Sequence, residues 1–466
     1  MGIEDQQVHR SEFGSEFKWG ITTAAFQVEG SCGADGKGAS VWDVFTEKKG
    51  KIKDGHKAST ACDFYNHYQK DIALIRRLHI PNFRFSISWP RVMPTGMKPV
   101  NQKGIDFYNR VIDHCLENDV TPWLTLYHWD LPQALEERSG WTNREVVSWF
   151  SDYAEVCAKH FGDRVKNWLV LNEPMVFTGA GYFLGIHAPG RTGLKNFFPA
   201  VHHVVLSMAE GGRILKSLVP DAEVGTSFSC SHIDPYSDRE KDIKAARRAD
   251  ALLNRLFVEP VLGLGYPVQD VPILKGLQKY IKPGDEEKMK FDFDFIGLQN
   301  YTREIVRYSL LTPYIHARLV KAEKRQVPLT SMNWEVYPPA IYHVLKKFNA
   351  YPQIRKLYIT ENGAAFPDRV TDGLVDDPQR LQYIQDNIAQ VYKARQEGCK
   401  VDGYFIWTLT DNFEWAEGYH PRFGIIYVDY ATQKRIIKSS GKWYGRFLSG
   451  QVGSAKPLEH ALNVKL

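Results

Sequence analysis

Residues 357–366 read LYITENGAAF, and residues 167–176 read NWLVLNEPMV. Each stretch begins as an apolar run, which is typical of a β-strand that is buried on both faces of a parallel sheet. Each run then ends in polar residues that include an acid, Glu361 in the first stretch and Glu173 in the second. A buried strand with a carboxylate at its last position places that acid at the edge of the sheet.

Six further runs of the same kind occur along the chain. The eight runs cover residues 17–29, 82–88, 121–129, 166–173, 222–229, 293–301, 356–362 and 402–409. Amphipathic patterns separate most of them, for example at 104–119 and 378–398, where apolar residues recur at helical spacing. Alternating strands and helices predict right-handed crossovers in a parallel sheet. Eight such units predict a closed (β/α)8 barrel, or TIM barrel, of the α/β class.

No linker, low-complexity block or repeat divides the chain, so we expect one domain over residues 16–448. Residues 1–15 are expected to be a disordered or vector-derived lead, and residues 449–466 a flexible tail. Residues 30–60 and 303–340 are too long for simple connections between a strand and a helix. In a barrel, such loops lie at the carboxyl ends of the strands, so we expect both to build a pocket there.

The composition argues against several classes of protein. The 466 residues carry a formal net charge of +5, and their basic clusters are interleaved with acids, which disfavours a nucleic-acid-binding stripe. No apolar run approaches the roughly 20 residues of a membrane helix, and the N-terminus lacks the apolar core of a signal peptide. The six cysteines are scattered without metal-ligand spacing. We therefore expect a cytoplasmic protein with reduced thiols and without nucleic-acid, membrane, metal or organic-cofactor partners.

The predicted strands end in residues that a barrel core would not use. Acids, amides, an imidazole and indoles appear there, among them Gln27, Arg84, His128, Trp129, Asn172, Glu173, Ser229, Gln299, Tyr301, Glu361 and Trp407. Barrel enzymes place their chemistry at this rim. A single carboxylate at a strand end more often enters solvent or caps the next helix. Two acids among so many hydrogen-bonding groups favour a catalytic site.

Two carboxyl groups facing each other across a barrel mouth suit the hydrolysis of a glycosidic bond. That reaction uses one acid that protonates the leaving oxygen and one ionised carboxylate that meets an oxocarbenium-like centre. Arg84 and Tyr301 are expected within reach of Glu361 and would keep it ionised, which makes Glu361 the nucleophile. Glu173, flanked by Trp129, has less counter-charge, so we expect a raised pKa and a role as the acid/base.

At these residues the sequence resembles the family 1 glycoside hydrolases, the β-glucosidase family. The resemblance covers residues 15–446 and rests on motifs in the order of the family: FKWGITTAAFQVEGS (17–31), FRFSISWPR (83–91), YHWDLP (127–132), NEP (172–174), HAPG (187–190), NWEVYP (333–338), TENG (360–363), DNFEW (411–415), RFGIIYVDY (422–430) and KSSGKWY (438–444). It implies a (β/α)8 barrel and a retaining double displacement through a covalent glycosyl-enzyme. In such enzymes the two carboxyl groups lie about 5 to 5.5 Å apart.

The resemblance also implies the roles of individual residues. Glu173 is implied as the acid/base and Glu361 as the nucleophile, with Arg84 and Tyr301 supporting the nucleophile. The implied substrate contacts are Gln27, His128, Trp129, Asn172, Tyr301, Trp334, Trp407, Glu414, Trp415 and Phe423. The expected substrates are β-linked glucosides or short oligosaccharides such as cellobiose. The sequence leaves open the preference among glucose, galactose and fucose, and it leaves open whether the chain forms a homo-oligomer.

Single residues mark where the sequence departs from the family pattern and where it disfavours related activities. Val170 stands where the family usually has Thr, and Gln299 takes the position of an Asn. A phospho-glycosidase would need a cationic clamp where Glu414 stands, and a plant-type thioglucosidase would have Gln in place of Glu173. A sugar-binding barrel without activity is disfavoured because both carboxylates are intact. An assay with a chromogenic aryl glucoside distinguishes this last alternative.

Three weaker motifs favour ordinary structural roles. GAGYFLG at 179–185 has the wrong spacing for a dinucleotide-binding loop. His202 and His203 are more typical of a protein core than of a metal site. Asn300 begins a formal glycosylation sequon, but we discount it because it lies at the predicted pocket rim.

Overall fold

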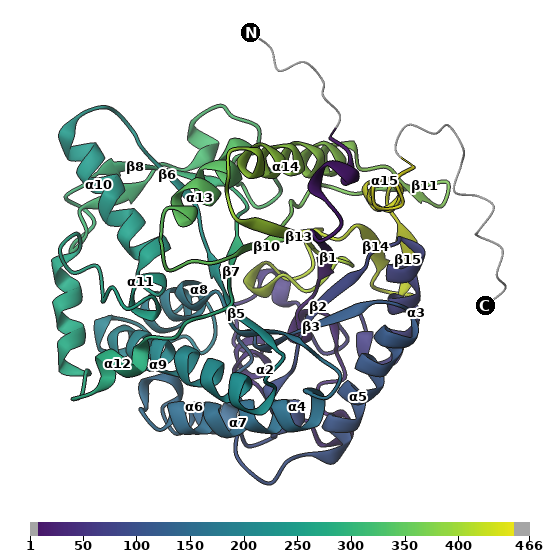
Figure 1. Ribbon diagram of the computed structural model, residues 1–466, viewed down its shortest axis with the longest axis horizontal. Coiled ribbons are helices and arrows are strands. Elements are labelled where there is room, and N and C mark those ends of the chain that lie inside the picture. Colours follow the sequence, from purple (N-terminus) through teal and green to yellow (C-terminus); the bar gives the residue numbers. More distant parts are fainter. Residues whose placement is uncertain (1–7, 452–466) are drawn as a thin grey trace.

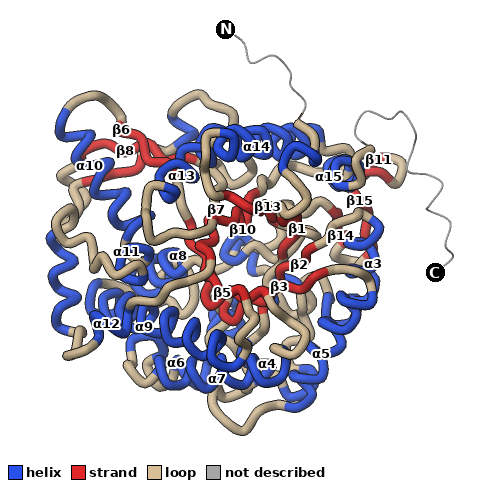
Figure 2. Tube along the Cα trace, viewed as in Figure 1, coloured by secondary structure: helices blue, strands red, loops and turns tan. Residues whose placement is uncertain are grey.

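The computed structural model describes residues 8–451, and its centre is a closed barrel of eight parallel strands. The barrel strands are β1 (Lys18–Thr22), β2 (Asn82–Ser86), β3 (Thr121–Tyr127), β4 (Asn167–Asn172), β5 (Glu223–Ser229), β7 (Phe295–Gln299), β10 (Leu357–Asn362) and β13 (Val401–Trp407). Figure 1 and Figure 2 show these strands in the middle of the molecule with helices around them. The predicted (β/α)8 barrel is confirmed.

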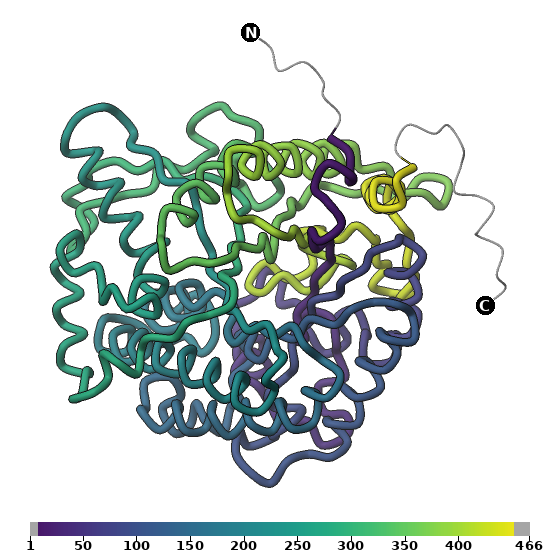
Figure 3. The backbone as a smooth tube through the Cα atoms, in the orientation of Figure 1, coloured from purple at the N-terminus to yellow at the C-terminus, as the bar shows by residue number. Residues whose placement is uncertain are grey.

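The first and last barrel strands close the ring. Lys18 of β1 lies opposite Gly403 of β13, and Thr22 lies opposite Trp407. Figure 3 shows this closure as the purple N-terminal segment beside the yellow-green segment near the C-terminus. Because every strand of a closed barrel has two neighbours, no edge of this sheet is left unpaired.

The outer layer consists of helices that bury one apolar stripe. The longer helices are α3 (Phe64–Arg77), α5 (Gln102–Glu117), α7 (Val146–Phe161), α9 (Leu194–Leu218), α10 (Glu240–Asp250), α13 (Pro339–Asn349), α14 (Pro378–Gln396) and α15 (Ser439–Leu448). The helices predicted at 104–119 and 378–398 correspond to α5 and α14. In α5, Ile105, Val111 and Ile112 are buried at helical spacing. None of the helices in residues 8–451 combines the length and the apolar character that crossing a bilayer requires.

Shorter elements complete the domain. The short helices are α1 (Ala25–Val28), α2 (Val41–Thr46), α4 (Trp89–Val92), α6 (Gln133–Glu136), α8 (Pro174–Thr178), α11 (Val258–Val261) and α12 (Asp285–Met289). The strands outside the barrel are β6 (His232–Pro235), β8 (Arg303–Tyr308), β9 (Ala317–Leu319), β11 (Val370–Thr371), β12 (Leu374–Val375), β14 (Ile426–Asp429) and β15 (Lys434–Ile437). Because the small sheets formed by these strands follow barrel strands in sequence, they extend the βα loops.

An apolar cluster fills the interior of the barrel. It consists of Trp123, Leu169, Phe295, Tyr358 and Phe405, each from a different strand. The indole of Trp123 lies with its centroid 5.0 to 5.8 Å from the three other aromatic rings. This cluster closes the barrel from below, so a ligand can enter only from the carboxyl ends of the strands.

Two predicted boundaries are wrong. The strand predicted over 17–29 ends at Thr22, and Ala25–Val28 form the short helix α1 instead, whose first N–H donates to Ser86 Oγ at 2.7 Å. The domain starts before residue 16, since Phe13 is buried with its ring 4.8 Å from that of Trp19. The predicted lead therefore covers too many residues. Its first seven residues, and residues 452–466 of the predicted tail, lie outside the described residues.

The two long insertions have different positions. Residues 303–340 contain β8 and β9, which form a three-stranded sheet with β6, seen at the upper left of Figure 2. This insertion contributes residues to the pocket described below, as predicted. Residues 30–60 contribute none to its lining, so that expectation is wrong. Instead, the indole of Trp42 packs 4.6 Å from that of Trp415 and supports the pocket from behind.

Candidate active site

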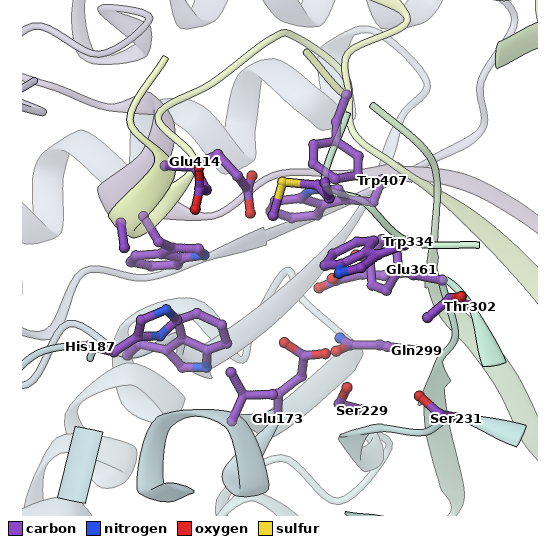
Figure 4. A pocket seen from close by; sticks show the side chains of 18 of the residues that line it. Glu173, His187, Ser229, Ser231, Gln299, Thr302, Trp334, Glu361, Trp407 and Glu414 are labelled. Carbon is purple, nitrogen blue, oxygen red and sulfur yellow. The ribbon is translucent and has the colours of Figure 1, made fainter. Parts of the chain in front are cut away.

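A cavity of about 340 Å³ opens at the carboxyl ends of the barrel strands. Most of the predicted site residues line it: Gln27, His128, Trp129, Glu173, Tyr301, Trp334, Glu361, Trp407, Glu414, Trp415 and Phe423. The remaining two, Arg84 and Asn172, are buried and bonded to lining residues. Figure 4 shows that the carboxyl groups of Glu173 and Glu361 project into the same cavity from different sides.

Glu361, near the end of β10, has a hydrogen-bond donor on each carboxylate oxygen. Arg84 Nη1 donates to Oε1 at 2.6 Å, and the Tyr301 hydroxyl donates to Oε2 at 2.7 Å. Arg84 is itself fixed by Thr125, whose hydroxyl accepts its Nε–H at 3.0 Å. Burial raises the pKa of Glu361, while the charge of Arg84 and the hydrogen bond from Tyr301 oppose that rise.

Glu173, directly after β4, has a different environment. Its backbone lies in the left-handed region with a φ of 48°, which few non-glycine residues adopt and which is common at functional sites. Burial and then the charge of Glu361 raise the pKa of Glu173 well above its ordinary value. The Ser229 hydroxyl and the more distant Arg84 only partly oppose this. When the two acids share one proton, Glu173 is therefore the site that holds it.

Asn172 connects three other residues of the site, Arg84, Gln299 and His128, through its side-chain amide. Its Oδ1 accepts hydrogen bonds from Arg84 Nη2 and from Gln299 Nε2, the latter at 2.6 Å. Its Nδ2 lies 3.1 Å from Nε2 of His128. Burial and the charge of Arg84 lower the pKa of His128 well below its ordinary value, so the imidazole is neutral. Since Nε2 accepts from the amide, its proton is on Nδ1.

Several buried polar atoms of this cavity have no partner among residues 8–451. They include Gln27 Oε1, His128 Nδ1 and Gln299 Oε1. A buried donor or acceptor that stays unpaired costs about 1 to 3 kcal/mol, so such atoms are rare unless a ligand satisfies them. Gln27 also donates to Glu414 at 3.2 Å, and burial raises the pKa of Glu414 to about 8. These groups suit a ligand with several hydroxyls.

Aromatic rings form the apolar walls of the cavity. The indoles of Trp129 and Trp415 lie 4.4 Å apart, and the ring of Trp334 lies 5.4 Å from that of Tyr301 and 6.1 Å from that of Phe423. Flat rings can cover the C–H faces of a pyranose while the polar atoms bind its hydroxyls. The cavity therefore offers aromatic rings to the apolar faces of a sugar and polar atoms to its hydroxyls.

The family model described as Glycosyl hydrolase family 1 matches residues 9–451. The chain belongs to this family. A β-glucosidase A of Thermotoga maritima is 44% identical over 93% of this chain and 97% of its own length. A 1,4-β-D-glucan glucohydrolase of Thermotoga neapolitana is 44% identical over 94% and 98%. A solved structure of the Thermotoga maritima β-glucosidase with deoxynojirimycin has a TM-score of 0.89 at 43% identity and covers 94% and 98% of the two chains.

The structure of this family 1 member also places residues in the cavity that the sequence did not single out. They are Val176, His187, Cys230, Ser231, Thr302, Glu304, Met332, Ala416 and Glu417. Cys230 and Ser231 directly follow β5, and Thr302 follows β7, so a longer window at each strand end would have included them. Glu304 lies within β8, inside the long insertion, where such a window gives no signal. Met332 lies in a long loop, where no periodic pattern indicates the direction of a side chain.

The weaker motifs have structural roles. His202 is buried with Nε2 2.8 Å from Asp285 Oδ2, and His203 Nδ1 lies 2.9 Å from the carbonyl of Trp141. The stretch 179–183 forms a turn of π-helix. Asn300 is buried, and its Nδ2 donates to the carbonyl of Cys230 at 2.8 Å.

One group among the described residues does have metal-ligand spacing. Asp54, His56 and His420 lie together, with Asp54 and His420 exposed. His56 Nδ1 accepts the backbone N–H of Tyr419 at 3.1 Å, so the neutral ring carries its proton on Nε2 and has no lone pair left for an ion. None of the three lines the cavity, and we assign no site to them.

Proposed function

We propose that this chain is a retaining exo-β-glycosidase that releases a non-reducing terminal β-D-glucosyl residue. The observation that carries the proposal is the unequal environment of two acids in one cavity. Glu361 is held by a cation and a hydroxyl, whereas burial and a neighbouring negative charge raise the pKa of Glu173. The β-glucosidases among its relatives, and the complex of one of them with deoxynojirimycin, support glucose as the sugar.

In the first step, an oxygen of Glu361 attacks the anomeric carbon while the bond to the leaving oxygen breaks. Glu173 gives its proton to that oxygen, and the aglycone leaves as an alcohol. A glycosyl ester on Glu361 remains. In the second step, water attacks the same carbon, Glu173 takes a proton from the water, and the ester bond breaks. Two inversions leave the released sugar in its original β configuration.

The unpartnered polar atoms then bind the glycone. Gln27, His128 and Glu414 offer acceptors and donors to sugar hydroxyls, and Asn172 lies beside the nucleophile. Because the apolar cluster closes the barrel below them, a polysaccharide cannot pass through, and only a terminal sugar can fill this end. The rings of Trp334 and Phe423 pack near the ring of Tyr301, and we assign both to the aglycone.

The finer parts of the proposal come from the resemblance. They are hydrolysis of cellobiose and some acceptance of galactosyl or fucosyl substrates. A cytoplasmic location is proposed from the scattered cysteines instead, and the state of assembly, monomer or homo-oligomer, stays open. A panel of aryl glycosides and short oligosaccharides tests the first two. Galactose differs from glucose in one hydroxyl, which we expect to face Gln27, Glu414 and Trp415.

Covalent trapping tests the mechanism. A 2-deoxy-2-fluoro-β-glucoside with an activated leaving group should inactivate the enzyme and leave one sugar adduct on the peptide that contains Glu361, as measured by mass spectrometry. Glu361→Ala should show no adduct. Proton spectra of early product should show the β anomer first. An adduct on another peptide, or α anomer released first, would refute the proposal.

A further inference from the structure

Two carboxyl groups of the cavity, those of Glu304 and Glu417, have no part in the mechanism above, and the Glu417 carboxyl is paired with Lys53. Glu304 is the second residue of β8 and lines the cavity, two residues after Thr302 and within electrostatic reach of Glu335, the residue that follows Trp334. Side chains alternate between the two faces of a strand. Arg303 is absent from the lining, whereas Glu304 belongs to it. The half-buried carboxyl of Glu304 is therefore available to a bound molecule.

The cations near Glu304 already have other partners. Glu335 accepts hydrogen bonds from Arg303 Nε at 2.9 Å and from Arg325 Nη1 at 2.7 Å, while the Arg325 Nε–H donates to no described residue, Glu304 included. Asp234 accepts a further one from Arg303 Nη1 at 3.0 Å. Within residues 8–451, no hydrogen bond or ion pair is formed by the Glu304 carboxyl. A carboxyl group taken partly out of water without a donor is unfavourable, and a ligand with a donor would relieve that cost.

Glu304 belongs to the side of the cavity that faces the aglycone. We define the Trp334 wall as Ser231, Thr302, Glu304, Met332 and Trp334, all of which line the cavity. Figure 4 shows Thr302 and Trp334 on the opposite side from Glu414 and His187. Because Glu414 and Gln27 are assigned to the glycone, a leaving group extends toward the Trp334 wall.

We propose that Glu304 selects the aglycone by its charge. Its carboxylate favours leaving groups that present an ammonium group to the Trp334 wall and disfavours leaving groups that carry a carboxylate. This inference rests on the proposed function and names a substrate class for the same cavity. Glu304 takes no part in bond breaking. Since the aglycone leaves in the first step, Glu304 influences kcat/KM and not the hydrolysis of the glycosyl-enzyme, which is the same for all glucosides.

Three aryl β-glucosides of similar shape test the proposal. Their phenyl rings carry a para-aminoethyl, para-ethyl or para-carboxyethyl group. At pH 8 the wild type should prefer the amine over the acid in kcat/KM by about tenfold or more, and Glu304→Gln should remove most of this preference. The para-ethyl glucoside should react at a similar rate with both enzymes, which also shows that the variant is folded.

Glu417→Gln is the matched control. Glu417 lines the same cavity, but it follows Trp415 and lies 3.6 Å from Lys53, with its side chain 46% exposed. The substitution removes the same charge without touching the Trp334 wall. It should keep the preference for the amine, because the preference depends on contact with Glu304 rather than on the total charge of the cavity.

A second readout is the pH dependence of the amine-to-acid ratio in the wild type and in Glu304→Gln. Burial raises the pKa of Glu304 to about 7, with Glu335 adding to the rise and Arg325 opposing it. The carboxyl is therefore mostly neutral at pH 6 and ionised at pH 8, so the amine-to-acid ratio should rise between them. Burial lowers the pKa of His232 on the neighbouring strand β6, whose ring pairs with Asp234, and the comparison with Glu304→Gln controls for its titration. Titration of Glu173 and Glu361 cancels in the ratio. Burial raises the pKa of Glu414, on the opposite side of the cavity, to about 8, so the same series is measured in Glu304→Gln, where the part of the rise that belongs to Glu304 should be lost.

The outcomes are distinct. A preference that Glu304→Gln leaves intact, an equal loss in Glu304→Gln and Glu417→Gln, or a ratio in the wild type that does not change with pH would each overturn the inference. Turnover of none of the three glucosides would refute the proposed function, and this inference with it. Normal turnover without discrimination would refute the inference alone.

Discussion

The end of β10 and the end of β4 hold two acids that are almost equally buried. Glu361 is 3% exposed and Glu173 is 7% exposed. Around Glu361, a guanidinium and a hydroxyl donate to the carboxylate, whereas around Glu173 the strongest electrostatic neighbour is the other carboxylate. Where burial is the same, the donors and charges within hydrogen-bond reach decide which acid holds the proton.

Arg84 produces most of this difference. It lies beneath the cavity on β2, and its guanidinium reaches both sides of the barrel. One end donates to Glu361 and the other to Asn172, the residue directly before Glu173. The charge of Arg84 is therefore held against Glu361, the proposed nucleophile, and acts on Glu173 without a direct hydrogen bond.

Removing the nucleophile should have the largest effect. Glu361→Gln keeps the shape of the side chain and both neighbours, yet it should lower kcat for an aryl glucoside by about ten-thousandfold or more, because no covalent intermediate can form. Steady-state assays with a chromogenic glucoside measure this. Circular dichroism should show the same fold as the wild type. A loss of tenfold or less would mean that another residue attacks the sugar.

Removing the proton donor should have an effect that depends on the leaving group. Glu173→Ala should lower kcat/KM for cellobiose by about a hundredfold to ten-thousandfold, since its leaving alcohol needs the proton. A glucoside with an acidic phenol as leaving group should lose far less in this ratio. Equal losses on both substrates would contradict the assignment of Glu173.

The same comparison predicts the pH profile. The first step needs Glu173 protonated, and the pKa of Glu173 is raised well above its ordinary value. Activity of the wild type should therefore persist well above the ordinary glutamate range and fall only when Glu173 loses its proton. In Glu173→Gln, kcat/KM for the glucoside whose leaving group is an acidic phenol should show no such alkaline fall. If the fall remains in the variant, a different group causes it.

Removing one donor from Glu361 should have an intermediate effect. Tyr301→Phe deletes a hydrogen bond to a charged acceptor, worth about 1.5 to 3 kcal/mol, so kcat/KM should fall by about ten- to a hundredfold. Because Tyr301 favours the ionised form, its loss should raise the pKa of Glu361 and move the acidic limb of the profile upward by about one pH unit or more. An unchanged acidic limb would show that Arg84 alone sets that pKa.

Strand-end chemistry made much of the site predictable from sequence. Glu173 and Glu361 stand at the ends of apolar runs that are typical of buried strands, and the resemblance supplied Trp334, Glu414 and Trp415 from loops. Glu304 could not be predicted in this way. It lies in a long insertion that was expected to be a loop, and its place in the cavity depends on the pairing of β8 with β6, which is a contact between segments far apart in sequence.

The fold was predictable to a similar extent. Eight apolar runs and the helices between them predicted the barrel. The spacing of apolar residues indicates whether a segment is a strand or a helix, and eight strand–helix units predict a closed barrel. The run over 17–29 was misjudged because residues 23–29 are as apolar as a strand. The Ser86 hydroxyl, which accepts the first N–H of α1, comes from another strand and leaves no local signal.

The smallest predicted effect concerns Gln299, which stands where the family usually has Asn. Its Nε2 donates to Asn172 Oδ1 at 2.6 Å, so it helps to orient the amide that also accepts from Arg84, the donor to Glu361. Gln299→Asn shortens this side chain and should weaken that neutral hydrogen bond, which is worth about 0.5 to 1.5 kcal/mol. We expect kcat/KM for aryl glucosides to fall about two- to tenfold with both limbs of the pH profile unchanged, since Arg84 and Tyr301 keep Glu361 as it is. A rise in kcat/KM would mean that the shorter residue fits the bound sugar better, and a shifted acidic limb would mean that Gln299 acts through the charge of Glu361.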